Sequence, residues 1–250
     1  MPFDLTHILV AVVLLFAAYV KGASGMGFPL ISTPMVALLL DIRTAITILI
    51  IPNLVMDITQ VFRGGFPVAV LRRFGWFSLS TIIGVFLGTK VLIVLPLWIL
   101  NLCLGVMVFI FVVSNWLRFE FTISPKLESV LSLPAGLISG FLNGMTNAAG
   151  PALAIYLYHL KLPKLEFIKS IAAIFIITKL SQLVAVSTWD LFNWSTLSLS
   201  LGVTLFVLLG FYAGLKTQDR VNQSTFNRGL LILLFVIGTI LMWRALTQAR

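Results

Sequence analysis

The sequence has little of what proteins use for redox, metal or acid–base chemistry. Its 250 residues include one cysteine and two histidines, and only 10% of them are charged. A lone Cys103 excludes an intrachain disulfide and a redox thiol pair. His7 and His159 are too few, and too poorly accompanied by other ligand types, to indicate a metal site. We therefore expect neither a bound metal nor a cofactor.

Apolar residues take the place of these groups. They make up 60% of the chain, against about 45–50% in soluble domains, and the mean hydropathy is +1.09. The net charge of +9 comes from basic residues spread over short loops, which is typical of membrane orientation rather than of a nucleic-acid groove. The sequence thus predicts an all-α polytopic membrane protein with a single domain, residues 1–250. The expected surroundings are a lipid bilayer and not nucleic acid.

Six apolar segments are long enough to cross a hydrocarbon core of about 30 Å, which takes about 20 residues. They are residues 44–62, 74–94, 97–117, 166–186, 194–215 and 227–246. Two further regions, 5–40 and 128–160, each hold two shorter apolar stretches around a break, "KGASGMGFPL" in the first and "NGMTNAAGP" in the second. A helical stretch of about 14 residues is roughly 21 Å long and does not comfortably span the bilayer.

The order of the segments indicates an internal duplication: a broken pair, three spans, and then the same again. The two repeats cover about residues 1–119 and 126–250. The residues that match between them, allowing a small insertion around "KLPKLE", are Gly27 with Gly144, Pro34 with Pro151, Gln60 with Gln182, and Asp57 with Lys179. These matches in the same order favour a duplication over chance.

The basic loop residues decide how the repeats are oriented, because Lys and Arg favour the cytoplasmic side. If each broken pair were one bent span, the repeats would be parallel and the basic residues would divide about evenly. If each pair is a hairpin that returns to its own side, most basic residues lie inside: Arg63, Arg72, Arg73, Arg118, Lys126, Lys161, Lys164, Lys169, Lys216, Arg220 and Arg228. Arg43, Lys90, Arg244 and Arg250 then lie outside. We therefore predict two inverted repeats, each a broken-helix hairpin plus three transmembrane helices.

The two breaks are the predicted binding site. Broken helices at corresponding places in inverted halves point to a transporter's substrate site. If the second half-helices begin at Pro29 and Pro151, their N-termini direct free N–H groups and positive dipole ends at an anion. The other residues that the breaks offer for binding are Ser24, Gly25, Gly27, Asn143, Gly144, Thr146 and Asn147. For a single break, glycines that only permit tight packing would be the preferred interpretation.

Ionisable and amide side chains deep within the spans are further candidates, because such residues are costly in a bilayer. Lys179 either contacts the substrate or forms a structural ion pair with Asp57, which is also a candidate for coupling transport to protons. Lys21 either faces the substrate or extends to the membrane interface. Gln60 and Gln182 are expected to line the cavity.

The stretches "GASGMGFPLISTP" and "GLISGFLNGMTNAAGPAL" resemble the sulfite exporter TauE/SafE family, also called the toluene-sulfonate uptake permeases. The resemblance covers nearly the whole chain. It implies movement of small organosulfur anions, such as sulfoacetate, related sulfonates or sulfite, mostly outward across the bacterial cytoplasmic membrane. This agrees with an anion site at the breaks.

The sequence therefore predicts a secondary transporter that works by alternating access, and not an enzyme. One alternative is a carrier or channel for another small ion, such as a cation bound at Asp57. A second is a membrane-embedded enzyme with Ser24 as nucleophile and Lys21 as base, and a third is a scaffold. The sequence leaves open whether the protein forms a homodimer.

Overall fold

The computed structural model describes residues 5–62, 68–117, 124–148, 150–218 and 223–248, and within these ranges it is helical with no strand. Six helices are long and apolar enough to cross a membrane. They are α3 (Ile42–Phe62), α5 (Gly75–Val94), α6 (Leu97–Leu117), α9 (Lys164–Thr188), α10 (Trp194–Thr217) and α11 (Gln223–Gln248). All six spans expected from hydropathy are thereby confirmed, with ends that differ by a few residues.

The two broken regions form the helices α1 (Leu5–Ser24) with α2 (Phe28–Leu39) and α7 (Pro125–Thr146) with α8 (Gly150–His159), while α4 (Val68–Arg73) is a short helix before α5. The first helix of each pair is longer than the expected apolar stretch of about 14 residues, since α1 has 20 residues and α7 has 22, against 12 in α2 and 10 in α8. The polar residues before each break stay helical because their side chains find partners inside the protein. Both first helices are therefore about 30 Å long at 1.5 Å per residue.

Close packing joins the first half of the chain to the second. Helix α1 packs on α10 and α7 packs on α5, while α3 contacts both α9 and α10 and α6 contacts α11. A Cβ added at Gly22 in α1 would collide with the Phe211 carbonyl in α10, and one added at Gly140 in α7 would collide with the Thr81 carbonyl in α5. Small residues at these positions let the helix backbones touch, as is common in membrane helix pairs.

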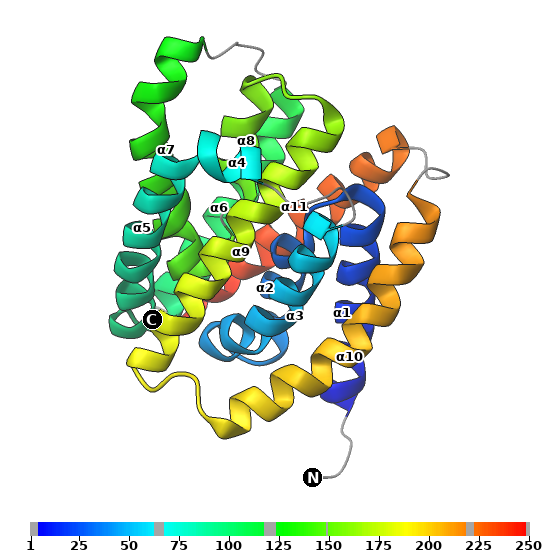
Figure 1. Cartoon of the computed structure of the whole chain (residues 1–250). Helices are drawn as coiled ribbons and strands as arrows, with labels where there is room; N and C mark the ends of the chain where they lie inside the picture. The colour runs from blue at the N-terminus through cyan, green and yellow to red at the C-terminus, as the bar shows by residue number, and fades with distance from the viewer. Residues whose placement is uncertain (1–4, 63–67, 118–123, 149, 219–222, 249–250) are drawn as a thin grey trace.

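Polar contacts identify which helix ends lie together. At one end, Arg73 at the end of α4 binds Glu128 near the start of α7 and Glu166 near the start of α9. At the other, Arg43 near the start of α3 donates to the carbonyls of Leu92, Ile93 and Leu95, where α5 ends. Figure 1 shows α4 and the start of α7 at the top and the turn from α9 to α10 at the bottom. The predicted loop residues Arg63, Arg118, Arg220 and Arg250 lie outside the described residues.

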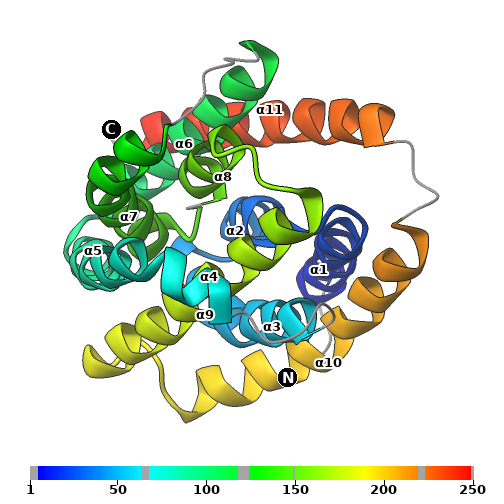
Figure 2. The same cartoon turned by 45° about the horizontal axis from the view of Figure 1, so that its top comes forward.

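Helix α2 lies at the centre of the bundle, and nine of its twelve residues are buried. Figure 2 shows α10 and α11 at the periphery. Their outward side chains are large and apolar, with Leu205 73% and Ile232 67% exposed. This arrangement surrounds a central polar region with helices that present apolar faces to lipid.

Candidate functional site

The backbone leaves helical geometry at both breaks. In the first, Gly25 and Gly27 have φ angles of 85° and 101°, and α2 begins at Phe28. In the second, Asn147 follows the last residue of α7 with φ 61°, and α8 begins at Gly150. Each second helix therefore starts one residue before the expected Pro29 or Pro151. Asparagine is among the few non-glycine residues that adopt the left-handed conformation readily.

The helix starts disagree with the predicted match of Gly27 with Gly144. The match of Gln60 with Gln182 also pairs Pro29 with Pro151 without any insertion. Gly144 was expected to lie in the break. It lies instead inside α7, where an added Cβ would collide with the Val85 carbonyl of α5. It is a packing residue. The abundance of glycine makes a match such as Gly27 with Gly144 unspecific, since α7 carries a glycine every four residues from Gly136 to Gly144 along its contact with α5.

The first half of the site is a buried ion pair. Lys21 in α1 donates from Nζ to Asp57 Oδ1 at 2.5 Å and to Asn53 Oδ1 at 2.7 Å, both on α3. Both members of the pair are 1% exposed. The Lys21 ammonium also lies 5.9 Å from the ring centroid of Phe175 on α9. Of the two alternatives for Lys179, the ion pair with Asp57 is therefore not formed, because each of these side chains turns to the broken helix of its own half.

The second half holds a lysine among amides. Lys179 in α9 is 0% exposed. Its Nζ donates to Asn143 Oδ1 at 3.0 Å, to Gln182 Oε1 at 2.8 Å, and to Asn147 Oδ1. Within the described part of the chain, no carboxylate is bonded to it. An ammonium held only by neutral oxygens has no counter-charge bonded to it, in a low-dielectric region where an isolated cation is costly.

The two glutamines tie the long helices to the breaks. Gln60 Nε2 donates to the Gly25 carbonyl at 2.6 Å, and Gln182 Nε2 donates to the Asn143 carbonyl at 3.1 Å. Ser24 and Thr146 turn their hydroxyls to nearby backbone: Ser24 donates to the Val20 and Met26 carbonyls, and Thr146 to that of Leu142. The expected residues at the breaks thus come together, but the hydroxyls of Ser24 and Thr146 are bonded to backbone carbonyls.

Two residues that the sequence did not single out complete the site. Asn147 Nδ2 donates to Thr33 Oγ1 on α2 at 2.8 Å, a contact between the second break and the first half. Asn53 holds Lys21, and its polarity within an apolar span was a usable signal. A threonine in an apolar helix such as α2 gives no such signal, because it commonly bonds to its own backbone.

Three buried polar atoms near the pair have no hydrogen-bond partner among the described residues: Asn53 Nδ2, Asp57 Oδ2 and Gln60 Oε1. Buried polar groups are nearly always bonded, so this cluster has unused capacity for a polar ligand. The described residues contain no group of three or more His, Cys, Asp or Glu that could hold a metal ion.

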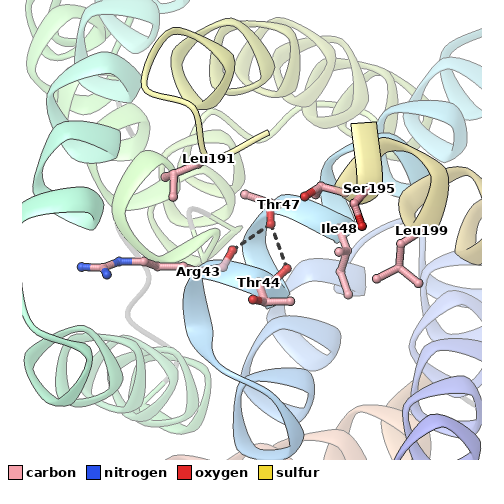
Figure 3. A pocket seen from close by; sticks show the side chains of 8 residues that line it. Arg43, Thr44, Thr47, Ile48, Leu191, Ser195 and Leu199 are labelled. Atoms are coloured by element: carbon pink, nitrogen blue, oxygen red, sulfur yellow. Dashed lines mark hydrogen bonds between the residues drawn. The ribbon is translucent and has the colours of Figure 1, made fainter. Parts of the chain in front are cut away.

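A separate cavity of about 240 Å³ lies between the starts of α3 and α10 (Figure 3). Its lining consists of Arg43, Thr44, Thr47, Ile48, Leu191, Ser195, Thr196 and Leu199. The guanidinium of Arg43 points away from it, toward the carbonyls at the end of α5. None of the buried lysines, amides or Asp57 lines this cavity, so it is distinct from the site at the breaks.

Comparison with known families gives one match. A family model described as "Sulfite exporter TauE/SafE" matches residues 10–241, which include both breaks and all the residues of the site. No curated protein and no solved structure shows significant similarity to the chain.

Proposed function

Because this multi-pass membrane protein belongs to the sulfite exporter TauE/SafE family, we propose that it exports a small organosulfur anion across the bacterial cytoplasmic membrane. The proposed substrates are sulfoacetate, a related sulfonate, or sulfite. The site binds the anion between the two breaks, and the carrier works by alternating access without catalysing a reaction.

The observation that carries this proposal is the environment of Lys179. Its ammonium is fully buried and bonded to three neutral amide oxygens. A sulfonate stays ionised at physiological pH, so its site needs a fixed cation and hydrogen-bond donors. An anion that joins Lys179 would supply the missing negative charge and offset the cost of burying the lysine. The N-terminus of α2, which begins directly after the first break, adds a positive dipole end.

The proposed architecture is two inverted repeats, each a broken-helix hairpin plus three transmembrane helices. Its support comes from packing relations that recur when the halves are exchanged: α1 on α10 and α7 on α5, then α3 on α10 and α9 on α5. The helix ends agree, since Arg244 near the end of α11 donates to the Leu38 carbonyl at the end of α2, away from the Arg73 cluster. Opposed hairpins of this kind bring their tips to the bilayer midplane.

Alternating access then requires the halves to separate on one side at a time. The Asn147–Thr33 hydrogen bond crosses between them next to Lys179. An anion bound at Lys179 competes with Asn147 for the same ammonium, so ligand binding acts directly on a contact between the halves. This gives the substrate a differential effect on two conformations, as any ligand-driven change requires.

The geometry disfavours the rival functions. A cation at Asp57 would have to displace Lys21, which lies 2.5 Å from that carboxylate. An enzyme with Ser24 and Lys21 as its catalytic pair is disfavoured because Ser24 Oγ bonds to backbone carbonyls while Lys21 bonds to α3. Each of the two side chains is thus engaged elsewhere.

A thermal-unfolding screen of the purified protein in detergent tests the proposal, with sulfite, sulfate, thiosulfate, sulfoacetate, taurine and acetate as ligands. A ligand at about 100 times its Kd stabilises by about 2.7 kcal/mol. We expect stabilisation by sulfite or a sulfonate and not by acetate, its loss in Lys179→Met, and its retention in the control Lys90→Met, whose side chain is exposed. No shift with any organosulfur anion would contradict the proposed function.

A further inference from the structure

Few of the buried side chains in the described part of the chain are acidic or basic. Apart from Tyr156 and His159 in α8, the buried ionisable residues among those described are Lys21, Asp57 and Lys179. Lys21 and Asp57 neutralise one another at 2.5 Å. Lys179 is the remaining charge, so the region around the breaks carries a net charge of about one positive unit.

These three charges belong to one site. Asp57 on α3 and Lys179 on α9 lie on helices that pack together. The Phe175 ring that faces Lys21 also comes from α9. One oxygen of Asp57, Oδ2, has no hydrogen-bond partner among the described residues. This side of the carboxylate is therefore not covered by a donor.

We propose that the site selects organosulfur anions by their charge and takes monoanions in preference to dianions, because Asp57 neutralises Lys21 and leaves Lys179 as the one net charge of the described site. The inference rests on the proposed function and names the substrate class of that same site. A monoanion beside Lys179 leaves the region neutral. A dianion brings a second negative charge that meets neutral amides and the Asp57 carboxylate, in a medium where an unpaired charge is strongly disfavoured.

The selection divides the substrates that the family resemblance implies into better and poorer ligands. Hydrogen sulfite and simple alkanesulfonates carry one charge and match the site. Sulfoacetate carries a sulfonate and a carboxylate, and both are ionised at neutral pH. It is therefore the poorer ligand, although its size and chemistry place it in the same class.

Two ligands of nearly the same shape isolate the charge. Sulfoacetate is a dianion, and in its amide, sulfoacetamide, an uncharged carboxamide replaces the carboxylate. Isothermal titration calorimetry in detergent gives a Kd for each without any effect of membrane potential. We expect sulfoacetamide to bind the unaltered protein at least about tenfold more tightly, which corresponds to about 1.4 kcal/mol.

Variants of the ion pair identify the cause. Asp57→Asn raises the local charge to about two, so the ratio of the two Kd values should move toward sulfoacetate by at least about tenfold. Lys21→Gln combined with Asp57→Asn carries the same change at position 57 but restores a single positive charge. That double variant should recover the preference for sulfoacetamide, and it provides the comparison should Asp57→Asn alone fail to fold.

The outcomes separate the two proposals. Equal or tighter binding of sulfoacetate by the unaltered protein overturns charge selection and leaves organosulfur export intact. A double variant that has lost the monoanion preference also overturns it, because shape rather than charge would then be responsible. Failure of sulfoacetamide, sulfoacetate, methanesulfonate and sulfite all to bind would overturn the proposed function, and the inference with it.

Discussion

Each of the two breaks has a buried lysine beside it, yet the two lysines are bonded in opposite ways. At the first, Lys21 projects from the broken helix α1 and meets a carboxylate on α3. At the second, Lys179 projects from the long helix α9 and meets amides on α7 and on α9 itself. The register that pairs Gln60 with Gln182 also matches Lys21 with Asn143 and Asp57 with Lys179. The two matched positions bond to each other in both halves, as Lys21–Asp57 in the first and as Asn143–Lys179 in the second.

The two lysines therefore differ in the charge that they leave for a ligand. A neutral ion pair fastens the first broken helix to its neighbour and leaves no charge for a ligand. The amide cage of Lys179 holds the side chain in place but leaves its charge uncompensated. In a bilayer such a charge lowers the stability of the protein. Its presence therefore favours a functional role for Lys179 over a purely structural one.

Removing Lys21 should have the largest effect on stability. Lys21→Met leaves Asp57 buried without its cation, which typically costs about 3–5 kcal/mol. Unfolding measured by thermal or denaturant titration in mixed micelles should show this loss, and the double variant with Asp57→Leu should recover most of it. A single variant as stable as the unaltered protein would mean that the pair does not hold α1 to α3.

Removing Lys179 should affect stability less. Lys179→Met leaves amide oxygens rather than a charge without a partner, and Gln182 Oε1 still accepts from Asn143 Nδ2 at 3.2 Å. The expected cost without ligand is roughly 0–2 kcal/mol. The same unfolding measurement therefore ranks the two lysines. A loss as large as that of Lys21→Met would assign Lys179 a structural role and remove the contrast between the halves.

The contrast between the lysines also marks what the sequence could predict. Hydropathy located all six spans because a membrane-spanning helix needs about 20 predominantly apolar residues in succession. The breaks were recognisable because glycine and proline interrupt such runs. The partner of Asp57 was not predictable, since it depends on how α1 and α3 are rotated toward each other. Equivalence within the repeats wrongly suggested Lys179.

The backbone at the breaks offers a smaller test of the same comparison. Gly25 has φ 85°, and a Cβ there would lie 3.3 Å from Gln60 Nε2 and from Ile168. Gly25→Ala should therefore cost about 1–2 kcal/mol from the left-handed conformation. Asn147→Gly keeps the same conformation at the second break without strain and loses side-chain hydrogen bonds, at about 1 kcal/mol.

Thermal unfolding of these two variants is measured with and without sulfite or a sulfonate. It distinguishes an effect on the backbone conformation of the break from an effect on ligand binding. Gly25→Ala should lower stability by a similar amount in both conditions. Asn147→Gly should change the shift produced by the ligand, because Asn147 contacts the Lys179 ammonium. If both variants changed the ligand shift equally, the two breaks would contribute alike to binding.

The smallest effect is expected at the end of the bundle where Arg73 joins the halves. Its guanidinium binds Glu128 at 2.9 Å and Glu166 at 3.4 Å, but its side chain is 39% exposed, and ion pairs of this kind contribute about 0–1 kcal/mol. The hydrogen bond to Glu128 raises the pKa of Arg73 above its usual value. A raised pKa contributes stability that is lost only as pH rises through the folded value, far into the alkaline range. The cost of Arg73→Ala should thus be constant between neutral and mildly alkaline pH and should shrink with added salt.

Thermal unfolding at low and high salt measures the cost of Arg73→Ala, with Arg72→Ala, an exposed neighbour, as the control. A loss above about 2 kcal/mol that salt does not reduce would mean that this end is held by a contact stronger than a surface ion pair.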